Sequence, residues 1–217
     1  MIPKLVIFDC DGVVVDSEHI TNKVMRDDLA MRGLVLDLDQ IMDLFVGGTI
    51  AGCAIQAAKM GADIPDDWVP MMYDKFFKAL AEQAELVPGI LTVLDALDVA
   101  GVPYAMGSNG PHKKMQITLG RTGIKDRFQG RIYSREDVPN PKPAPDVYLH
   151  AARLAGVGPQ DCVVVEDSVS GAKAGVAAGM RTLGFTRDTP VAKLRPIVDQ
   201  VFSDMSELPA LLGLTPQ

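Results

Sequence analysis

The hydrophobic positions of this chain follow one pattern up to about residue 84 and a different one after it. Leu5–Phe8 is a short apolar run ended by polar residues, which predicts a buried strand. From about Glu18 to Leu80 apolar residues recur at helical spacing, with Ser17 as the expected N-cap of the first helix. Trp68–Leu80 is predicted to be a helix of this block. The first part of the chain is therefore one strand followed by helices.

After Glu85, predicted strands alternate with predicted helices. The strands are short apolar runs, and proline or glycine marks the ends of the helices. The predicted strands are 102–110, 130–134, 161–168 and 181–185, with a last edge strand at 200–205. The predicted helices are 87–101, 111–123, 145–156 and 169–180. This alternation predicts the α/β fold class, with a Rossmann-like, open and mostly parallel sheet.

The position of the helical block predicts two domains. The first strand precedes this block, whereas the expected partner strands follow it, so the helices are best explained as an insertion into an α/β core. We expect a core domain made of residues 1–16 and 84–217 and a helical cap domain made of residues 17–83. The chain would cross between the domains near Asp16–Ser17 and again within Gln83–Pro88.

The composition is that of a globular protein with a sizeable core. The chain has 217 residues, of which 47% are hydrophobic and 23% are charged. Its formal net charge of -7 argues against unaided binding to nucleic acid or to an anionic membrane. No apolar run is long enough to span a bilayer, and the first apolar run ends at Asp9, too early for the core of a signal peptide. We expect a cytoplasmic protein that acts as a monomer.

The cysteines do not indicate a disulfide framework or a zinc site. Cys10, Cys53 and Cys162 are scattered, odd in number and form no CxxC motif. Asp9 and Asp11 flank Cys10, and we expect these two acids to raise the pKa of its thiol and weaken it as a nucleophile. Cys10 is best explained as a small residue that fills space.

Three predicted strands end in polar clusters. These clusters are Asp9 with Asp11, Ser108 with Asn109, and Glu166 with Asp167. Because the carboxyl ends of parallel strands open on one edge of a sheet, we expect these side chains to converge. Acids that meet in one crevice repel each other unless a cation lies among them, and carboxylate oxygens suit Mg²⁺. Each cluster alone could supply only N-caps and turns, but together they predict a magnesium site.

Lys142 adds a positive charge to this predicted site. It lies in the stretch NPKPAPD, where Pro141 and Pro143 flank it and stiffen the loop. A proline-flanked lysine can belong to an ordinary surface loop, but this one lies in the sequence between the Ser108 and Glu166 clusters. The ammonium, the Ser108 hydroxyl and the amides that begin the next helix would form a cradle for an anion. Such a cradle beside Mg²⁺ and a carboxylate suggests phosphoryl transfer.

The motifs together resemble those of the haloacid dehalogenase superfamily. The residues that carry the resemblance are Asp9–Val13 (DCDGV), Ser108–Asn109 (SN), Lys142–Asp146 (KPAPD) and Glu166–Ser168 (EDS). All of these motifs occur in the order typical of the superfamily. More narrowly, the chain resembles the β-phosphoglucomutase-like and phosphoglycolate phosphatase-like subfamily, which has a helical cap inserted after the first strand. The stretch SNGPHKKMQ at 108–116 is similar to the branch that includes 6-phosphogluconate phosphatase.

The resemblance implies roles for the two acids after the first strand. Asp9 would be the nucleophile that attacks phosphorus and forms an aspartyl phosphate, and it would also bind Mg²⁺. Asp11 would protonate the leaving alcohol and then take a proton from the attacking water, while its main-chain oxygen binds Mg²⁺. Dehalogenases of the superfamily lack the second aspartate, so the presence of Asp11 disfavours dehalogenation.

The resemblance also implies binding roles and a function. Ser108, Asn109 and Lys142 would hold the phosphoryl group. Asp167 would bind Mg²⁺ directly, and Glu166 would be either a further metal ligand or a partner of Lys142. The implied function is a Mg²⁺-dependent phosphatase for a small phosphorylated sugar or sugar acid, with 6-phosphogluconate as the favoured substrate.

Two alternatives remain. A sugar-phosphate mutase of the same fold needs a cation in the cap for a second phosphate, and mutase-like relatives place an arginine there. The corresponding stretch, 45–59, has no basic residue before Lys59, which argues against a mutase. This stretch offers Gly47, Gly48 and Thr49 instead, and other cap cations that could substitute are Lys23 and Lys75. A non-catalytic binding protein would usually lose the nucleophile or the acid, yet Asp9 and Asp11 are both present.

Overall fold

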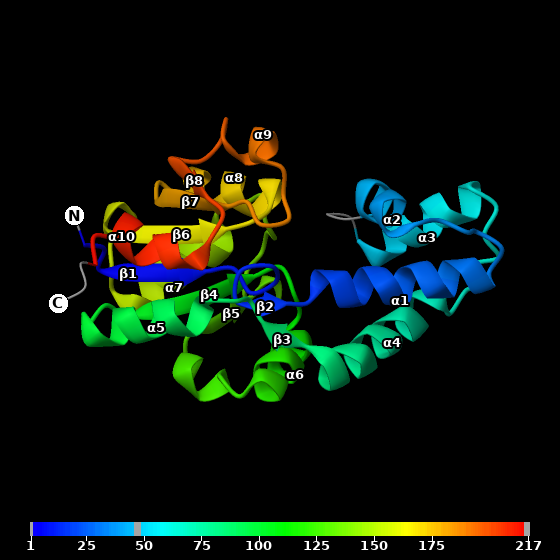
Figure 1. The fold of residues 1–217 in the computed structure, drawn as a ribbon, viewed down its shortest axis with the longest axis horizontal. Helices are drawn as coiled ribbons and strands as arrows, with labels where there is room; N and C mark the ends of the chain where they lie inside the picture. Colours follow the sequence, from blue (N-terminus) through cyan, green and yellow to red (C-terminus); the bar gives the residue numbers. More distant parts are fainter. Residues whose placement is uncertain (1, 46–48, 215–217) are drawn as a thin grey trace. The chain divides into compact units, whose positions relative to one another are not determined.

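The structure, a computed structural model, describes residues 2–45 and 49–214 (Figure 1). The described residues form two compact units. The core unit contains the chain up to Val15 and from Leu86 onward, and the helical unit is Asp16–Glu85. Each unit encloses its own cluster of buried hydrophobic side chains.

The core unit is built on a six-stranded parallel sheet. Its strands are β1 (Leu5–Phe8), β4 (Tyr104–Ser108), β5 (Ile132–Ser134), β6 (Cys162–Glu166), β7 (Arg181–Phe185) and β8 (Gln200–Phe202). Their order across the sheet is β5-β4-β1-β6-β7-β8, and neighbouring strands run parallel (Figure 1). Side chains alternate between the two faces of a strand, and Val6, Ile7 and Phe8 are all fully buried. Both faces of β1 are therefore covered, as in a doubly wound sheet.

Helices supply this cover. α7 and α8 pack on the face of the sheet that carries Ile7 and Val164, and Tyr148 and Ala151 of α7 belong to the same buried cluster. The helices of the core unit are α5 (Ile90–Val99), α6 (His112–Thr122), α7 (Asp146–Ala155), α8 (Val169–Ala177), α9 (Val191–Leu194) and α10 (Leu208–Leu211). Short 3-10 turns are η1 (Lys125–Phe128), η2 (Arg135–Asp137), η3 (Pro159–Asp161) and η4 (Met205–Glu207).

The helical unit contains α1 (Glu18–Met31), α2 (Leu38–Phe45), α3 (Ile50–Lys59) and α4 (Trp68–Gln83). Leu29, Ile41, Trp68 and Met72 are at the centre of its hydrophobic cluster, and none of them is exposed to solvent. Among the residues of this unit that the structure describes, Asp28 is a buried acid. Asp28 on α1 accepts hydrogen bonds from Arg32 Nε at 2.7 Å, Trp68 Nε1 at 2.6 Å and Lys75 Nζ at 2.5 Å. The carboxylate therefore ties α1 to α4.

The predicted fold class is confirmed, and the strands and helices predicted after Glu85 are all present. The last of them, β8, lies at the sheet edge as predicted. Ser17 precedes α1 as predicted, but its side chain makes no capping hydrogen bond. The pair formed by β2 (Val15–Asp16) and β3 (Glu85–Leu86) was not predicted, because strands of two residues leave no periodic pattern.

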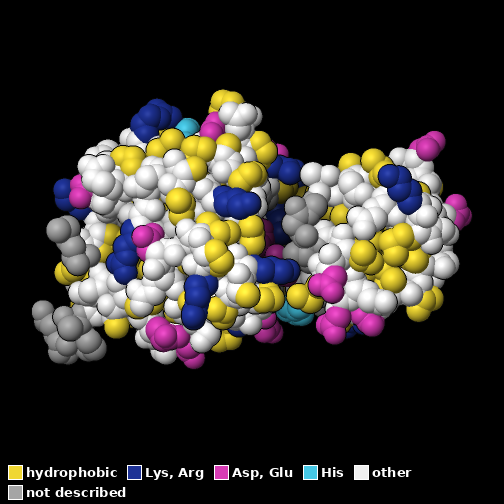
Figure 2. All heavy atoms as spheres, turned by 90° about the horizontal axis from the view of Figure 1, so that it is seen from above, with side chains coloured by type: hydrophobic (Ala, Val, Ile, Leu, Met, Phe, Trp, Pro, Cys, Tyr) yellow, Lys and Arg dark blue, Asp and Glu magenta, His cyan; other side chains and the backbone are white. Residues whose placement is uncertain are grey.

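Among the described residues, no single helix is long and apolar enough to cross a membrane, and only the bent pair α2 and α3 meets that test of length and composition together. Charged side chains of both signs are interspersed on the face shown in Figure 2.

Cys10, Cys53 and Cys162 are buried free thiols. Burial raises the pKa of the Cys10 thiol, and Asp11 and Asp9 add to the rise, as predicted.

Candidate active site

The candidate site lies where β1, β4 and β6 end. β1 is between β4 and β6 in the sheet, so the residues that follow these strands emerge side by side. Asp9 follows β1, and its amide donates to the Val165 carbonyl at 2.9 Å. Ser108 is the last residue of β4, and Glu166 is the last residue of β6. The topology thus places the predicted acids and the predicted hydroxyl at one edge of the sheet.

Lys142 joins two of these strand ends. Its Nζ lies 2.5 Å from Asp9 Oδ1 and 2.6 Å from Glu166 Oε1, and the side chain is almost fully buried. The ammonium also lies 4.7 Å from the centre of the Tyr148 ring, an arrangement that favours the cation. Burial alone would lower the pKa of Lys142, but Asp9 and Glu166 outweigh it and the pKa is raised. Lys142 is therefore held as a cation in one position.

Glu166 is surrounded by hydrogen-bond donors from the chain itself. Its Oε1 accepts from Lys142 Nζ and from Tyr148 Oη at 2.7 Å, and its Oε2 accepts from Ser168 N at 3.0 Å and Ser168 Oγ at 2.9 Å. A Cβ atom at Gly171 would lie 1.5 Å from Glu166 Oε1, so only glycine leaves room for this carboxylate. Both oxygens of Glu166 thus accept hydrogen bonds from the protein, as expected for an ion-pair partner of Lys142.

Asp9 is buried next to one lysine and two acids. Burial raises the pKa of Asp9 to about 7, Lys142 opposes this rise, and Glu166 and Asp11 add to it. Asp9 as a whole residue is only 7% exposed. The Lys142 ammonium therefore does not fully compensate for the burial of the Asp9 carboxylate, and a cation bound beside it would favour the charged form.

Asn109 and Ser108 fix the loops around this centre. The Asn109 side chain accepts from Lys142 N at 2.9 Å and donates to Lys142 O at 3.2 Å, which joins the two loops. Ser108 is buried, and its Oγ accepts from Gly110 N at 2.9 Å. The hydroxyl can still donate to an anion, whereas both polar ends of the Asn109 amide contact the main chain of Lys142.

The segment after β5 supports the 108–112 loop. Ser134 Oγ donates to Gly110 O at 2.7 Å, and Ser134 N donates to Asp137 Oδ2 at 2.7 Å. His112 Nε2 lies 2.8 Å from the same carboxylate oxygen of Asp137. Hydrogen bonds from Ser134 and His112 lower the pKa of Asp137 despite the opposing effect of its burial. These contacts hold the loop that carries Ser108.

Lys114 is a second ammonium at the site, and the sequence did not single it out. Its Nζ lies 2.8 Å from Asp11 Oδ1. Burial acts to lower the pKa of Lys114, but Asp11 outweighs it and the pKa is raised. Lys114 is the third residue of α6, a helix whose first turn contains no acid. A cation in that turn opposes the helix dipole, and this mismatch was the signal that could have identified it.

Asp167 lies against the turn that follows β1. Gly12 has a φ of +79°, a conformation that favours glycine. A Cβ atom at Gly12 would lie 2.0 Å from Asp167 Oδ2, so the carboxylate occupies the space that any other residue would fill. Asp167 is 6% exposed. The close approach of Asp167 to the Gly12 main chain brings it beside the segment that carries Asp9 and Asp11.

This donor set fits a small divalent cation with few protein ligands. No group of three or more His, Cys, Asp or Glu side chains within 2–45 and 49–214 is arranged to hold a metal. Glu166 bonds to protein donors, and one oxygen of Asp11 bonds to Lys114. The other oxygen atoms of these motifs are the carboxylates of Asp9 and Asp167 and the main-chain oxygen of Asp11, and Asp9 Oδ1 contacts Lys142. Mg²⁺ is bound in this way, by one or two carboxylates with water and phosphate completing the shell.

The structure describes some of the residues that the sequence singled out in the cap. Thr49 caps α3, since its Oγ1 accepts from Gly52 N at 3.0 Å, while Gly47 and Gly48 lie outside the described residues. Lys75, one of the cations that could have served a mutase, is bonded to Asp28. Lys23 is exposed on α1. Lys75 is thus already neutralised within the helical unit.

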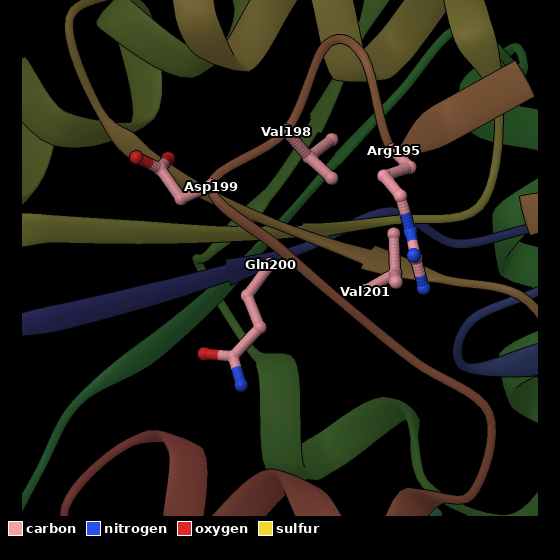
Figure 3. Close-up of a pocket in the computed structure, with 5 residues that line it drawn as sticks. All are labelled: Arg195, Val198, Asp199, Gln200 and Val201. Carbon is pink, nitrogen blue, oxygen red and sulfur yellow. The ribbon is translucent and has the colours of Figure 1, made fainter. Parts of the chain in front are cut away.

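A separate pocket lies at the edge of the core sheet (Figure 3). Its volume is about 290 Å³, and it is lined by Arg195, Val198, Asp199, Gln200 and Val201. Strands β6 and β7 separate β8, which carries Gln200 and Val201, from β1. Asp199 Oδ2 accepts from Thr182 N at 2.7 Å, so the acid in this pocket holds the sheet edge together. The predicted site residues do not line it.

Comparisons of the chain with a family model and with curated proteins point to the same family. A family described as haloacid dehalogenase-like hydrolases matches residues 3–179. Among curated proteins, 6-phosphogluconate phosphatase of Escherichia coli is 30% identical over 213 residues, which cover 96% of this chain and 94% of that protein. Hexitol phosphatase A of Escherichia coli is 28% identical over 206 residues, covering 93% of this chain and 91% of that protein.

A solved structure gives the same picture. The structure of a haloacid dehalogenase family hydrolase from Deinococcus radiodurans, with bound phosphate and sodium, superposes with a TM-score of 0.87. The two chains are 35% identical, and the match covers 99% of this chain and 98% of the other. The likeness therefore extends over both units of the chain.

Proposed function

The chain belongs to the haloacid dehalogenase-like hydrolases and is a phosphatase of that family, and we propose that it hydrolyses a small phosphorylated sugar or sugar acid with the help of Mg²⁺. The observation that carries this proposal is the buried Lys142 ammonium, which bonds to Asp9 and Glu166 at the ends of two neighbouring strands. It leaves Asp9 beside a fixed positive charge, in a buried setting that raises the pKa of its carboxyl group to about 7.

Asp9 is the proposed nucleophile. One of its carboxylate oxygens attacks the phosphorus atom, the bond from phosphorus to the leaving oxygen breaks, and an aspartyl phosphate forms. Lys142 and the Ser108 hydroxyl hold the phosphoryl oxygens, which gain charge during transfer. Lys142 is already in place before substrate arrives, because Glu166 and the Tyr148 ring fix its ammonium. Little reorganisation is then needed at the moment of reaction.

Asp11 is the proposed acid and base. It gives a proton to the leaving alcohol in the first step and takes a proton from the water that attacks the aspartyl phosphate in the second. Hydrolysis of that intermediate returns Asp9 to its carboxylate form and releases phosphate. Asn109 acts on this chemistry through the main chain of Lys142, which its side chain holds.

Asp9, Asp167 and the main-chain oxygen of Asp11 are the proposed ligands of Mg²⁺. The metal, when bound, neutralises charge on the phosphoryl group and on the surrounding acids. The sequence left two roles open for Glu166, a metal ligand or a partner of Lys142, and we propose the second. The reason is that both of its oxygens accept hydrogen bonds from protein donors.

The proposed substrate class follows from the relatives. 6-phosphogluconate phosphatase and hexitol phosphatase A both act, by name, on phosphorylated sugar acids or sugar alcohols, and the chain matches nearly their whole length. We propose that the core unit breaks the ester bond and that the helical unit, as a cap domain, selects the rest of the substrate. 6-phosphogluconate is the first compound to test.

A sugar-phosphate mutase is the less supported alternative. It would need a cation in the helical unit for a second phosphate, and Lys75 is bonded to Asp28 instead. The stretch 45–59 has no basic residue before Lys59. Incubation with β-glucose 1-phosphate and a bisphosphate activator separates the two functions, because a mutase yields the isomer without free phosphate.

The direct test is phosphate release from 6-phosphogluconate, from a panel of small phosphate esters and from p-nitrophenyl phosphate, with and without Mg²⁺. The wild-type protein should release phosphate only with the metal, and EDTA should abolish the activity. Asp9→Asn should lose turnover and keep its fold by circular dichroism. Turnover that persists in EDTA would contradict the metal assignment, and an Asp9→Asn variant as active as wild type would contradict the proposed nucleophile.

A further inference from the structure

Two lysines reach the candidate site, and the proposed mechanism uses only one of them. Lys142 lies between Asp9 and Glu166, whereas Lys114 comes from α6 and lies 2.8 Å from Asp11 Oδ1. The side chains of Lys114 and Asp11 are only 21% and 18% exposed. A partly buried ion pair keeps a single geometry better than an exposed ion pair does. Lys114 therefore restricts the position of the carboxyl group proposed as acid and base.

The two oxygens of Asp11 have different surroundings. Oδ1 contacts Lys114, and Oδ2 lies beside Gly110. A Cβ atom at Gly110 would be 3.5 Å from Asp11 Oδ2 and 3.2 Å from Ser108 Oγ. Asp11 Oδ2 and the hydroxyl proposed to bind phosphate therefore approach the same point of the backbone. Asp11 Oδ2, and not the oxygen that contacts Lys114, therefore lies on the side of the Ser108 hydroxyl.

The place of Lys114 in α6 is explained by this contact and not by helix stability. Side chains in a helix lean toward its N-terminus, so Lys114 in the first turn points toward the loop that begins at Ser108. A cation there opposes the helix dipole. Its contact with Asp11 compensates for this unfavourable position.

We propose that Lys114 is a positioning residue that holds Asp11 so that its Oδ2 exchanges the proton with the leaving oxygen and with water. This inference rests on the proposed function. In the first step the bond from phosphorus to the leaving oxygen breaks, the bond to Asp9 forms, and the proton of Asp11 moves to the leaving oxygen. Lys114 keeps its own protons throughout, so its effect depends on how much the leaving group needs protonation.

Substituted phenyl phosphates measure that need directly. p-Nitrophenolate leaves without a proton, whereas p-methoxyphenolate is more basic and leaves better when protonated. We expect Lys114→Met to lower kcat/KM about 100-fold for p-methoxyphenyl phosphate and only a few-fold for p-nitrophenyl phosphate. Lys114→Arg keeps a cation at the position, so its losses of kcat/KM relative to wild type should differ less between the two esters. Lys125→Met, which removes an exposed lysine beyond the end of α6, should show none.

The ratio of kcat/KM for the two esters does not depend on how much of a variant is folded. A loss of folded protein therefore cannot imitate the expected result. A second comparison uses Asp11→Asn, in which the ratio should not change further when Lys114→Met is added, because Lys114 acts only through Asp11. An equal loss for both esters, or a further change of the ratio in the Asp11→Asn background, would overturn the inference.

The same experiment separates failure of the inference from failure of the proposed function. If wild-type protein releases phosphate from neither ester, or if Asp9→Asn is as active as wild type, the proposed function is wrong. If wild type is active and depends on Asp9 while Lys114→Met affects both esters equally, only the role of Lys114 is wrong.

Discussion

At the scale of single residues, the site is a cluster of carboxylates with fewer positive charges. Asp9, Asp11 and Glu166 each contact a lysine, and Asp9 retains a pKa raised to about 7 by its burial. Lys142 bonds to two of these acids at once and is almost fully buried. Its removal should therefore matter for stability as well as for activity.

Lys142→Met should lower the free energy of unfolding by about 3 to 5 kcal/mol, because it leaves two buried carboxylates without their cation. Urea unfolding of the full chain measures this loss. Adding Glu166→Gln should restore part of it, since one of the two charges is then gone. Lys173→Met, at an exposed position of α8, is the control and should be close to wild type. A Lys142→Met variant as stable as this control would show that the buried pair is not formed.

Gly12 tests the placement of Asp167. Gly12→Ala would bring a Cβ atom to 2.0 Å from Asp167 Oδ2 and strain a backbone with a φ of +79°. We expect the Mg²⁺ concentration for half-maximal activity to rise by at least about 10-fold, because the carboxylate must move. Gly130→Ala is the matched control, with a φ of +71° but no atom within 4 Å of the added Cβ. An equal effect of both substitutions would mean that backbone strain alone is responsible.

The residue scale is also where the sequence was least informative. Asp9, Ser108 and Glu166 were predicted because they stand at the ends of recognisable strands. Lys114 and Tyr148 were not, because each reaches the site from within a helix. The apolar pattern of a helix does not mark such residues, and the one signal for Lys114, a cation in the first turn of α6, is shared by Lys113. The hydrogen bond from Tyr148 to Glu166 follows from packing across the sheet, which has no local signal.

At the scale of elements, Asp28 joins α1 to α4 inside the helical unit. Burial acts to raise the pKa of Asp28, but hydrogen bonds from Lys75, Arg32 and Trp68 outweigh this effect and lower the pKa. At pH values between the pKa of Asp28 in the folded protein and its higher pKa in the unfolded chain, the unfolded chain binds more protons. The stabilisation is therefore complete above the pKa of the unfolded chain, near 3.9, and is lost as the pH falls through the lower pKa of the folded protein.

Asp28→Asn should lower the free energy of unfolding by about 1 to 3 kcal/mol at neutral pH, because it removes a charged acceptor with three donors. Urea unfolding at pH 7 and below pH 4 measures the difference from wild type, which should shrink in acid. Asp66→Asn, at an exposed position before α4, should change little at either pH. A difference for Asp28→Asn that is the same at both pH values would contradict a lowered pKa.

The elements themselves were largely predictable after residue 85. Strands such as β6 are continuous apolar runs because they are buried on both faces, and proline or glycine ends the helices between them. The helical unit was harder, since its separate helices α2 and α3 are short and follow each other closely. Strands β2 and β3 are defined by their pairing with each other, which no local pattern encodes.

At the scale of the whole molecule, the order of the strands determines the site. β1, β4 and β6 are far apart in sequence, yet their order in the sheet makes their ends neighbours. The sequence alone predicted that these ends would share an edge, because parallel strands end on one side of a sheet. The order β5-β4-β1-β6-β7-β8 came from the structure, since pairing across long connections cannot be read from local patterns.

Binding of Mg²⁺ should stabilise the folded molecule as a whole. A ligand that binds only the folded state raises the thermal midpoint by mass action, and the proposed ligands Asp9 and Asp167 follow two different strands that are paired only in the folded protein. We expect Mg²⁺ to raise the midpoint of the wild-type protein in a thermal scan and EDTA to reverse the rise. Asp167→Asn should show a much smaller rise, and a rise equal to that of wild type would contradict the proposed role of Asp167.

The central claim is that Asp9 carries the phosphoryl group during hydrolysis. The most direct measurement is to mix the protein with p-nitrophenyl phosphate and Mg²⁺, stop the reaction with acid during turnover, and locate the modified residue by mass spectrometry after digestion. The account predicts the added mass of one phosphoryl group on Asp9 in the wild-type protein and none on this peptide in Asp9→Asn. Phosphate release from wild type without any modification of Asp9, or with the group on another residue, would contradict it.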